Sequence, residues 1–414
     1  MLGSSVAATA LALLALVPSS LATTIPLRRR DTGITNADGS INIEKLDLEA
    51  SHLAKKYERT RNNWKANSIA NPKSKISRKS KRGVLKLTTQ DTAVWTGTVT
   101  VGTPAQTLNI YFDSGSSDFT IASSSCPSSS CGTKNRYTVA KSTTAVKTST
   151  TVTTNFVDGT SSSGALVEDT VHIAGLVATS QDIIAATSLS STVSDLEADG
   201  MGLAYPSLSQ AFSASLPFTL YSQNQGGRPQ NFAMLLKSSG TSEITFGAWN
   251  RAHVGAQPIK WFNVLLPTGS SFRSYWQIGA SLPYLNGSPA STTYATHIID
   301  SGTTFIVAPP SAAAAFYAQI SGAEQYSDNY WTFPCATPPD LSFSFARVTN
   351  QLFSVSAYNF NLGYLAEDPT RCVGAVIGQN LGLGTSWILG DAFMMNWYII
   401  HDVAANRIGI AQPR

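Results

Sequence analysis

Charged residues are scarce in this chain of 414 residues. Asp, Glu, Lys and Arg together make up 13% of the sequence, whereas hydrophobic residues make up 43%. This balance excludes a disordered chain, because such chains combine high charge with few apolar side chains. No repeat architecture is indicated either. The length is sufficient for two lobes that each bury a substantial core.

Residue patterns typical of metal sites and of serine hydrolases are also missing. The chain has only five His and four Cys, the His residues are scattered, and neither CxxC nor HExxH occurs. We therefore expect no metal and no cofactor. No GxSxG sequence is present, and no His is placed by any motif, so a serine hydrolase is not supported.

Long apolar runs are absent except near the N-terminus. An apolar stretch at residues 11–17 is followed by small residues that end at Ala22, which is typical of a cleavable secretory signal. No other run is long enough to span a membrane, and no anchor signal precedes Arg414. We expect a signal peptide at residues 1–22 and secretion in soluble form, without a membrane anchor; a vacuolar location is the alternative.

Charge is unevenly distributed along the rest of the chain. Residues 23–82 hold 15 Lys or Arg against 6 Asp or Glu, a balance of +9, whereas residues 83–414 hold 14 against 19, a balance of −5. A basic run is usually a solvated tail, and here it does not indicate nucleic-acid binding. Its position and its dibasic end, Lys81 and Arg82, favour a removable pro-segment that complements the acidic body and is released by acid.

Short β-branched or aromatic runs alternate with clusters rich in Gly, Ser, Thr, Asn and Pro. This pattern predicts an all-β fold with few helices. The runs read as strands are residues 95–101, 152–156, 165–173 and 259–264, and the pieces read as helical are residues 207–213, 310–320 and 391–396.

One six-residue pattern occurs twice, at residues 112–117 (FDSGSS) and 299–304 (IDSGTT), 187 residues apart. A single Asp-Ser-Gly is usually an ordinary turn, but two copies, each after an apolar segment, predict one site built from both halves. Asp113 and Asp300 would then face each other and share a proton, so that one acts as acid and the other as base around a water. We place the division between the halves, residues 83–256 and 257–414, near Ala256.

Four longer segments, together with the two Asp-Ser-Gly motifs, form a pattern that is typical of one protein family. The segments are residues 95–104 (WTGTVTVGTP), 199–206 (DGMGLAYP), 275–278 (YWQI) and 387–393 (WILGDAF), with a similar ending through residue 410. With both Asp-Ser-Gly motifs, they make the chain resemble the pepsin-like aspartic endopeptidases, especially secreted fungal ones, over nearly its whole length. The resemblance implies a bilobal all-β fold with two duplicated β lobes and a central cleft that binds an extended polypeptide substrate.

The resemblance also implies roles for individual residues. Asp113 and Asp300 activate the water and protonate the leaving amide. The residues that support them in the two loops are Ser114, Gly115, Ser116, Ser301, Gly302 and Thr303. Among these, Ser116 and Thr303 hydrogen-bond the outer carboxylate oxygens, and Ser114 with Ser301 locks the loops together. The pro-segment would act as an intramolecular inhibitor of a monomeric enzyme.

A pro-segment lysine is implied between the two carboxylates. The sequence does not single out one of the candidates, which include Lys55, Lys56, Lys65, Lys73 and Lys75.

The chain departs from the family at the flap that covers the cleft. The aligned flap residues are Phe156, Val157, Asp158 and Gly159. Phe156 replaces the usual tyrosine, and Thr120 replaces the tryptophan that bonds to it, so a phenolic hydrogen bond is lost. We expect slower or differently selective cleavage. The segment 200–202 (GMG) is also one residue shorter than in the family.

Four cysteines in a secreted chain suggest two disulfides. The local pairing, Cys126 with Cys131 and Cys335 with Cys372, is the easiest to justify among the three connectivities. The Cys126–Cys131 spacing is also that of the family. Asn286 lies in the only N-glycosylation sequon, and Pro289 directly after the sequon argues against its occupancy.

Two other functions compete with an active endopeptidase. One is a catalytically silent relative that binds peptides or proteins in its cleft, and the other is a carbohydrate-binding module. The intact aspartates and hydroxyls favour an enzyme, and most Trp residues lie in apolar runs, where core packing explains them. We expect an acidic pH optimum and, because few ion pairs can be lost, stability in acid.

Overall fold

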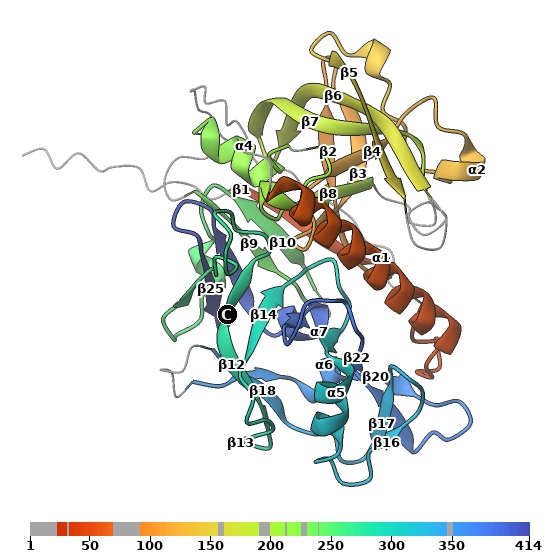
Figure 1. Cartoon of the computed structure of the whole chain (residues 1–414), viewed down its shortest axis with the longest axis vertical. Helices are drawn as coiled ribbons and strands as arrows, with labels where there is room; N and C mark the ends of the chain where they lie inside the picture. Colours follow the sequence, from red (N-terminus) through yellow and green to blue (C-terminus); the bar gives the residue numbers. More distant parts are fainter. Residues whose placement is uncertain are drawn as a thin grey trace, which may run out of the picture.

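This computed structural model describes residues 23–30, 33–68, 92–155, 161–189, 199–211, 213–224, 230–238, 240–345 and 351–414. The signal expected at residues 1–22 lies outside these ranges, as do the dibasic pair Lys81-Arg82 and the flap residues 156–159. The fold is the expected all-β one. Two β-rich lobes lie one above the other in Figure 1, and the long helix α1 (Ile43–Asn67) crosses between them.

The largest sheet runs through both halves of the chain. Thirteen strands of the described residues form it, in an order that places β1 between β10 and β2. In spatial order they are β11 (Lys260–Asn263), β25 (Arg407–Ala411), β24 (Tyr398–Asp402), β9 (Asn231–Leu235), β10 (Ser242–Phe246), β1 (Thr23–Arg30), β2 (Thr92–Val101), β3 (Gln106–Asp113), β8 (Asp199–Gly202), β4 (Phe119–Ala122), β7 (Leu176–Ser188), β6 (Ser161–Ile173) and β5 (Val146–Asn155). The strand from the basic segment thus connects two others: residues 23–27 pair with β10 and residues 28–30 pair with β2.

The lower lobe of Figure 1 contains two further sheets. The first comprises β19 (Phe353–Val355), β18 (Leu341–Phe345), β12 (Gln277–Leu285), β14 (Ala295–Ile299), β23 (Trp387–Leu389), β15 (Ile306–Ala308) and β22 (Val376–Gly378), with β13 (Ser288–Pro289) beside β12. The second comprises β16 (Glu324–Gln325), β17 (Trp331–Pro334), β21 (Arg371–Gly374) and β20 (Asn361–Tyr364).

Short helices connect these strands. They are α2 (Ser128–Cys131), α4 (Leu216–Ser222), α5 (Pro310–Tyr317), α6 (Ala357–Phe360) and α7 (Asp391–Met394), with 3-10 turns η1 (Val139–Lys141), η2 (Pro206–Leu208) and η3 (Arg251–His253). The predicted strands fall on β2, β5, β6 and β11, and the predicted helical pieces fall on η2, α5 and α7. None of the described helices is long and apolar enough to cross a membrane.

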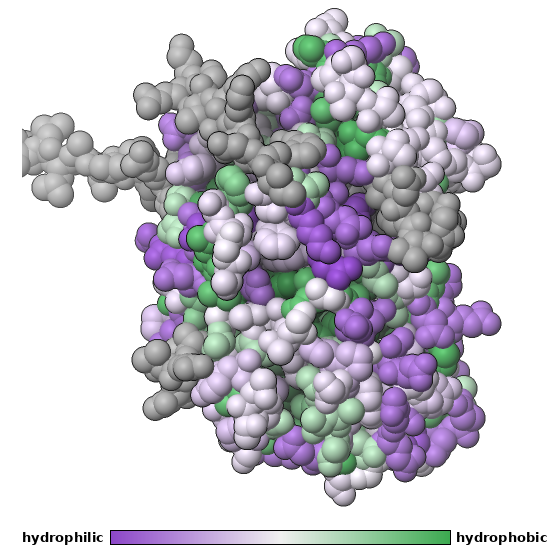
Figure 2. All heavy atoms as spheres, in the orientation of Figure 1, coloured by the Kyte–Doolittle hydropathy of each residue, from purple (hydrophilic) through white to green (hydrophobic). Residues whose placement is uncertain are grey.

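The helix α1 was not predicted, although its sequence explains it. The side chain of Asn42 caps the first turn by accepting a hydrogen bond from the backbone N–H of Lys45, 3.1 Å away. Buried side chains then recur at spacings of three or four residues, which is the period of one helix face. They are Leu46, Ala50, Leu53, Tyr57 and Thr60. This face lies against the body of the protein, and the exposed face between the lobes is hydrophilic in Figure 2.

The two Asp-Ser-Gly loops have the same local topology. β3 lies parallel to β8, and β14 lies parallel to β23, so each loop leaves its strand beside a parallel neighbour. A glycine in or just after that neighbour lets the loop pass. A Cβ at Gly202 would come within 2.4 Å of the backbone nitrogen of Ser117, and one at Gly390 within 2.1 Å of the carbonyl oxygen of Thr303. Any side chain at either position would displace the loop.

A continuous apolar core holds the lobes together. Trp276 is fully buried, and its indole N–H donates to the carbonyl oxygen of Leu203, 3.0 Å away and next to β8. The disulfides are Cys126–Cys131 and Cys335–Cys372, which is the pairing we expected. Asn286 is exposed in the turn between β12 and β13.

Candidate active site

The two aspartates of the repeated motif lie together at the centre of the molecule. Asp113 ends β3 and Asp300 follows β14, and their exposed fractions are 1% and 0%. Carboxylates are seldom buried without partners. Here both contact one group, the ammonium nitrogen of Lys56.

Each carboxylate has the same donors from its own loop. Oδ1 of Asp113 accepts from the backbone N–H of Gly115 at 2.8 Å, and its Oδ2 accepts from the hydroxyl of Ser116 at 2.5 Å. Oδ1 of Asp300 accepts from Gly302 N–H at 2.9 Å, and its Oδ2 from the hydroxyl of Thr303 at 2.6 Å. These bonds fix both carboxylates in orientation.

The serines after the two aspartates connect the loops to each other. The hydroxyl of Ser114 donates to the carbonyl oxygen of Ile299 at 3.1 Å, and that of Ser301 donates to the carbonyl oxygen of Phe112 at 2.9 Å. The hydroxyl of Ser114 also accepts from the backbone N–H of Ser301 at 2.9 Å, and that of Ser301 accepts from the backbone N–H of Ser114 at 3.1 Å. Four hydrogen bonds therefore hold the carboxylates in register, and threonine is not required for this at position 301.

The structure singles out Lys56 among the lysines that the sequence left open. Its Nζ lies 2.7 Å from Oδ1 of Asp113 and 2.9 and 2.8 Å from the two oxygens of Asp300. It also donates to the carbonyl oxygen of Gly302 at 3.0 Å. The hydroxyl of Tyr57 donates to Oδ2 of Asp300 at 2.8 Å. The ammonium thus occupies the space between the two carboxylates.

Burial and charge act in opposite directions on these groups. Burial lowers the pKa of the Lys56 amine, but the two carboxylates outweigh burial, so that the pKa is raised. Burial and the neighbouring Asp300 raise the pKa of Asp113 against the effect of Lys56. Burial also acts to raise the pKa of Asp300, but the Lys56 ammonium and hydrogen bonds from its neighbours lower it to about 2. Asp300 is therefore the carboxylate that keeps its charge longest on acidification.

The helix α1 is fastened to both lobes. On the N-terminal side of the cleft, Asn63 donates to the carbonyl oxygen of Leu208 at 2.9 Å, and Asn67 donates to those of Ser207 and Ser209 at 2.9 and 2.7 Å. On the other side, Gln379 donates to the carbonyl oxygen of Ala50 at 2.9 Å, and Tyr330 to that of Leu46 at 3.1 Å. Residues 43–67 consequently block the space between the lobes.

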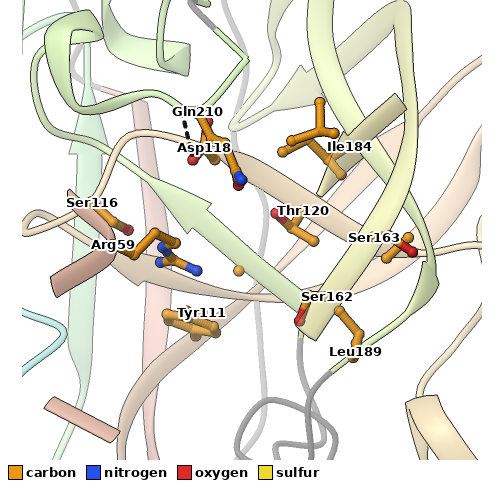
Figure 3. A pocket seen from close by; sticks show the side chains of 13 residues that line it. Arg59, Tyr111, Ser116, Asp118, Thr120, Ser162, Ser163, Ile184, Leu189 and Gln210 are labelled. Atoms are coloured by element: carbon orange, nitrogen blue, oxygen red, sulfur yellow. Dashed lines mark hydrogen bonds between the residues drawn. The ribbon is translucent and has the colours of Figure 1, made fainter. Parts of the chain in front are cut away.

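A pocket of about 50 Å³ lies beside Asp113 in the N-terminal lobe. Tyr111 lines it from β3, Ser116 lines it from the loop that follows β3, and Thr120 lines it from β4. Figure 3 shows Arg59 of α1 reaching into this pocket over Tyr111. Thr120, which the resemblance marked as a departure, thus faces an open space.

Sequence reasoning missed two residues of this site, Tyr57 and Arg59. The signal that was present is the helical spacing of buried residues in α1, which places Lys56, Tyr57 and Thr60 within little more than one turn. The hydroxyl of Thr60 lies 2.7 Å from that of Tyr275, whose ring stacks on Tyr57 at 5.5 Å between centroids.

Comparisons with known proteins agree with this geometry. The sequence model of the eukaryotic aspartyl protease family matches residues 94–413. An aspartic protease of Phaffia rhodozyma is 34% identical over 348 residues, which are 82% of this chain and 81% of the relative. Major aspartyl peptidase 1 of Cryptococcus neoformans is 28% identical over 392 residues, covering 88% and 78% of the two chains. Pepsin A of Sus scrofa is 30% identical over 326 residues, covering 76% and 80%. The chain therefore belongs to the eukaryotic aspartyl proteases and is a pepsin-like aspartic endopeptidase.

Proposed function

We propose that the chain is the precursor of a secreted peptide hydrolase in which Asp113 and Asp300 are the catalytic pair. One observation carries the proposal: two matching loops from the two lobes aim their carboxylates at the same nitrogen atom, at distances of 2.7 to 2.9 Å. A small polar group is held at that point by both carboxylates. Once Lys56 has left, a water molecule can take its place.

The chemistry follows from the coupling of the two carboxylates. Two buried carboxylates so close together share one proton, because ionising both is unfavourable. The ionised member removes a proton from the water as the water oxygen attacks the peptide carbonyl carbon, and the protonated member hydrogen-bonds the carbonyl oxygen. The tetrahedral species then breaks its C–N bond, while the nitrogen accepts a proton from the pair and leaves as an amine. No covalent enzyme intermediate forms.

In the precursor, residues 23–82 act as an intramolecular inhibitor. The helix α1 excludes a polypeptide from the cleft, and Lys56 neutralises the carboxylates that a water would need. Because only 12% of the lysine side chain is exposed and both carboxylates are buried, these ion pairs are screened little by salt. We infer that the precursor is inactive at neutral pH.

Acid is the signal for release. The pKa of Asp300 is lowered from its ordinary value of 3.8 to about 2. A depressed carboxylate pKa means that the ion pair stabilises the closed precursor above about pH 4 and that this stabilisation is lost as the pH falls toward 2. The raised pKa of Asp113 acts in the opposite direction and opposes part of this loss, because burial favours the protonated form of that carboxyl in the closed precursor.

Secretion is the inferred route to an acidic environment. The signal-like residues 1–22 come before the pro-segment, and two disulfides fit an oxidising compartment. N-terminal sequencing of protein recovered from the medium tests this. A start near residue 23 or 83 is expected, and retention of residue 1 would contradict it.

Cleavage assays on the purified full chain test the catalytic proposal. We expect cleavage of an acid-denatured protein after exposure to pH 3, inhibition by a statine-type transition-state mimic, and a loss of about 10²- to 10⁴-fold in Asp113→Asn and Asp300→Asn. Asp340→Asn, at an exposed carboxylate in the C-terminal half, is the matched control. If the mimic binds but no pH gives cleavage, the chain is a silent relative that recognises peptides without cutting them.

A further inference from the structure

The pocket beside Asp113 holds a positively charged side chain of the precursor itself. Arg59 follows Lys56 by three residues, so both lie on the same side of α1. Lys56 contacts the carboxylates while Arg59 enters the pocket (Figure 3). Among the described residues that line the pocket, Arg59 is the one basic side chain. When α1 leaves, the described lining of the pocket no longer contains a cation.

The remaining lining suits a long side chain with a polar end. Val152, Ile184 and Leu189 are apolar, whereas Tyr111, Thr120 and Gln210 present hydroxyl or amide groups. The side chains of Lys and Arg match this lining, because each has an aliphatic stem that ends in a charged group. Tyr111 fits closely against β8: a Cβ at Gly200 would lie 2.8 Å from its hydroxyl oxygen.

Asp118 supplies a negative charge to the pocket. Its Oδ1 accepts from the hydroxyl of Ser209 at 2.7 Å and from the backbone N–H of Gln210 at 2.8 Å, whereas its Oδ2 accepts from the same N–H at 3.1 Å. Oδ2 therefore keeps acceptor capacity. In the described part of the chain no basic side chain forms an ion pair with Asp118, and the buried Nε of Arg59 has no hydrogen-bond partner. Arg59 enters the pocket without reaching the carboxylate.

The pocket is close enough to the reacting atoms to select a residue at the cut. Ser116 lines the pocket and donates to Asp113 at 2.5 Å, and Tyr111 precedes Asp113 by two residues on the same strand. A substrate side chain in this pocket therefore belongs to a residue next to the bond that is cleaved.

We propose that this pocket selects a Lys or Arg side chain next to the cleaved peptide bond and that Asp118 binds its charge. The inference rests on the proposed function, because the pocket acts only in an enzyme that cuts at Asp113 and Asp300. It also makes the basic run at residues 78–82 (RKSKR) a substrate for the mature enzyme. Activation then proceeds by cleavage of one precursor by an already active copy.

Quenched peptides that differ at one position test the preference. Each peptide carries Arg, Lys, citrulline or norleucine on either side of the cut, and acid-activated full-length enzyme is the catalyst. Citrulline has the shape of Arg without its charge. We expect kcat/KM for Arg and Lys to exceed that for citrulline by about ten- to a hundred-fold, as one charge-assisted hydrogen bond provides.

Asp118→Asn should abolish this difference by lowering kcat/KM for the Arg and Lys peptides to the value for the citrulline peptide. The amide keeps an oxygen for Ser209 and Gln210, so the local fold is retained. Asp340→Asn is the matched control and should preserve the preference. Equal cleavage of the Arg and citrulline peptides by the parent enzyme would overturn the inference while leaving the proposed function intact.

The precursor gives a second readout that does not depend on catalysis. Hydrogen exchange of the α1 amides at pH 6 measures how tightly the helix is held. We expect Arg59→Lys to match the parent and Arg59→Leu to exchange about ten-fold faster, with exposed Lys45→Leu as the control. Slower exchange in Arg59→Leu would mean that the pocket prefers an apolar side chain, and it would refute the inference even for an inactive protein.

Discussion

His401 is buried in the large sheet, where aromatic rings surround its imidazole. The side chain is fully buried on β24, stacks on Phe232 with 4.2 Å between ring centroids and meets the edge of Trp276 at 5.0 Å. Neither ring nitrogen has a hydrogen-bond partner in the described part of the chain. Burial lowers the pKa of this histidine from 6.5 to about 3. We expect this residue to limit stability in acid.

The sign and size of the effect follow from proton linkage. The unfolded chain binds a proton at His401 below about pH 6.5, whereas the folded chain does so only near pH 3, so stability is lost as the pH falls between these values. At pH 4 the difference is about 2.5 pKa units, or about 3 kcal/mol, and at pH 7 it is close to zero. This loss opposes the acid stability that we expected from the scarcity of ion pairs. His297, also buried, with its pKa lowered to about 3, adds to it.

The substitution His401→Phe removes the titrating group and keeps the stacked ring. Its effect on packing is the same at every pH, so the change between pH 7 and pH 4 isolates the proton linkage. Urea unfolding of the full chain, followed by tryptophan fluorescence, measures the free energy of unfolding at both pH values. All proteins carry Asp113→Asn, so that cleavage by the proposed catalytic pair does not interfere. We expect the parent to lose about 3 kcal/mol more than the variant on going from pH 7 to pH 4.

His172→Phe is the matched control, because its imidazole on β6 is partly exposed. It should lose as much stability as the parent. Equal losses in the parent and in His401→Phe would refute the reasoning, since they would show that His401 binds its proton equally well in the folded and unfolded chains.

Three other perturbations test the site and the fold. Lys56→Met removes one partner of a buried ion pair, and such a loss typically costs about 3 to 5 kcal/mol. The variant precursor should therefore cleave a peptide at pH 6, where we expect the parent to be inactive. Continued inhibition of the variant would contradict the role of Lys56. Gly390→Ala places a Cβ 2.1 Å from a backbone oxygen and should destabilise by about 3 kcal/mol or more in thermal unfolding, whereas Gly279→Ala, with one contact at 3.8 Å, should be tolerated. In a double variant, Thr120→Trp should fill the pocket and Phe156→Tyr should supply a phenolic donor, so that kcat/KM changes about ten-fold. Unchanged kinetics would mean that these positions do not set selectivity.

The sequence was sufficient for the parts of the fold that depend on local patterns. The duplicated motif predicted that Asp113 and Asp300 belong to one site, because each copy places a carboxylate and a hydroxyl at the same spacing after an apolar segment. The donors at Ser116 and Thr303 were readable for the same reason, since a hydroxyl three residues after the carboxylate can reach its outer oxygen. Strand positions followed from β-branched and aromatic runs.

The features that the sequence did not predict depend on contacts between residues far apart in the chain. Lys56 lies 57 residues from Asp113 and 244 from Asp300, and nothing local distinguishes it from Lys55. The helix α1 was overlooked because its buried face alternates with many charged residues and reads as a solvated basic stretch. Arg59 could not be placed in a pocket whose walls come from β3 to β8. Only the packed chain brings these walls together.

The place of β1 has a consequence for maturation. This strand belongs to the proposed pro-segment, and it pairs with β10 through residues 23–27 and with β2 through residues 28–30. Removing it divides the sheet into groups of five and seven strands and bares two strand edges at once. Unpaired edges attract any other extended chain, including those of neighbouring molecules. In the proposed precursor, residues 23–82 therefore hold two groups of strands together as well as filling the cleft, and we expect the protein to be most prone to aggregate while this segment is removed.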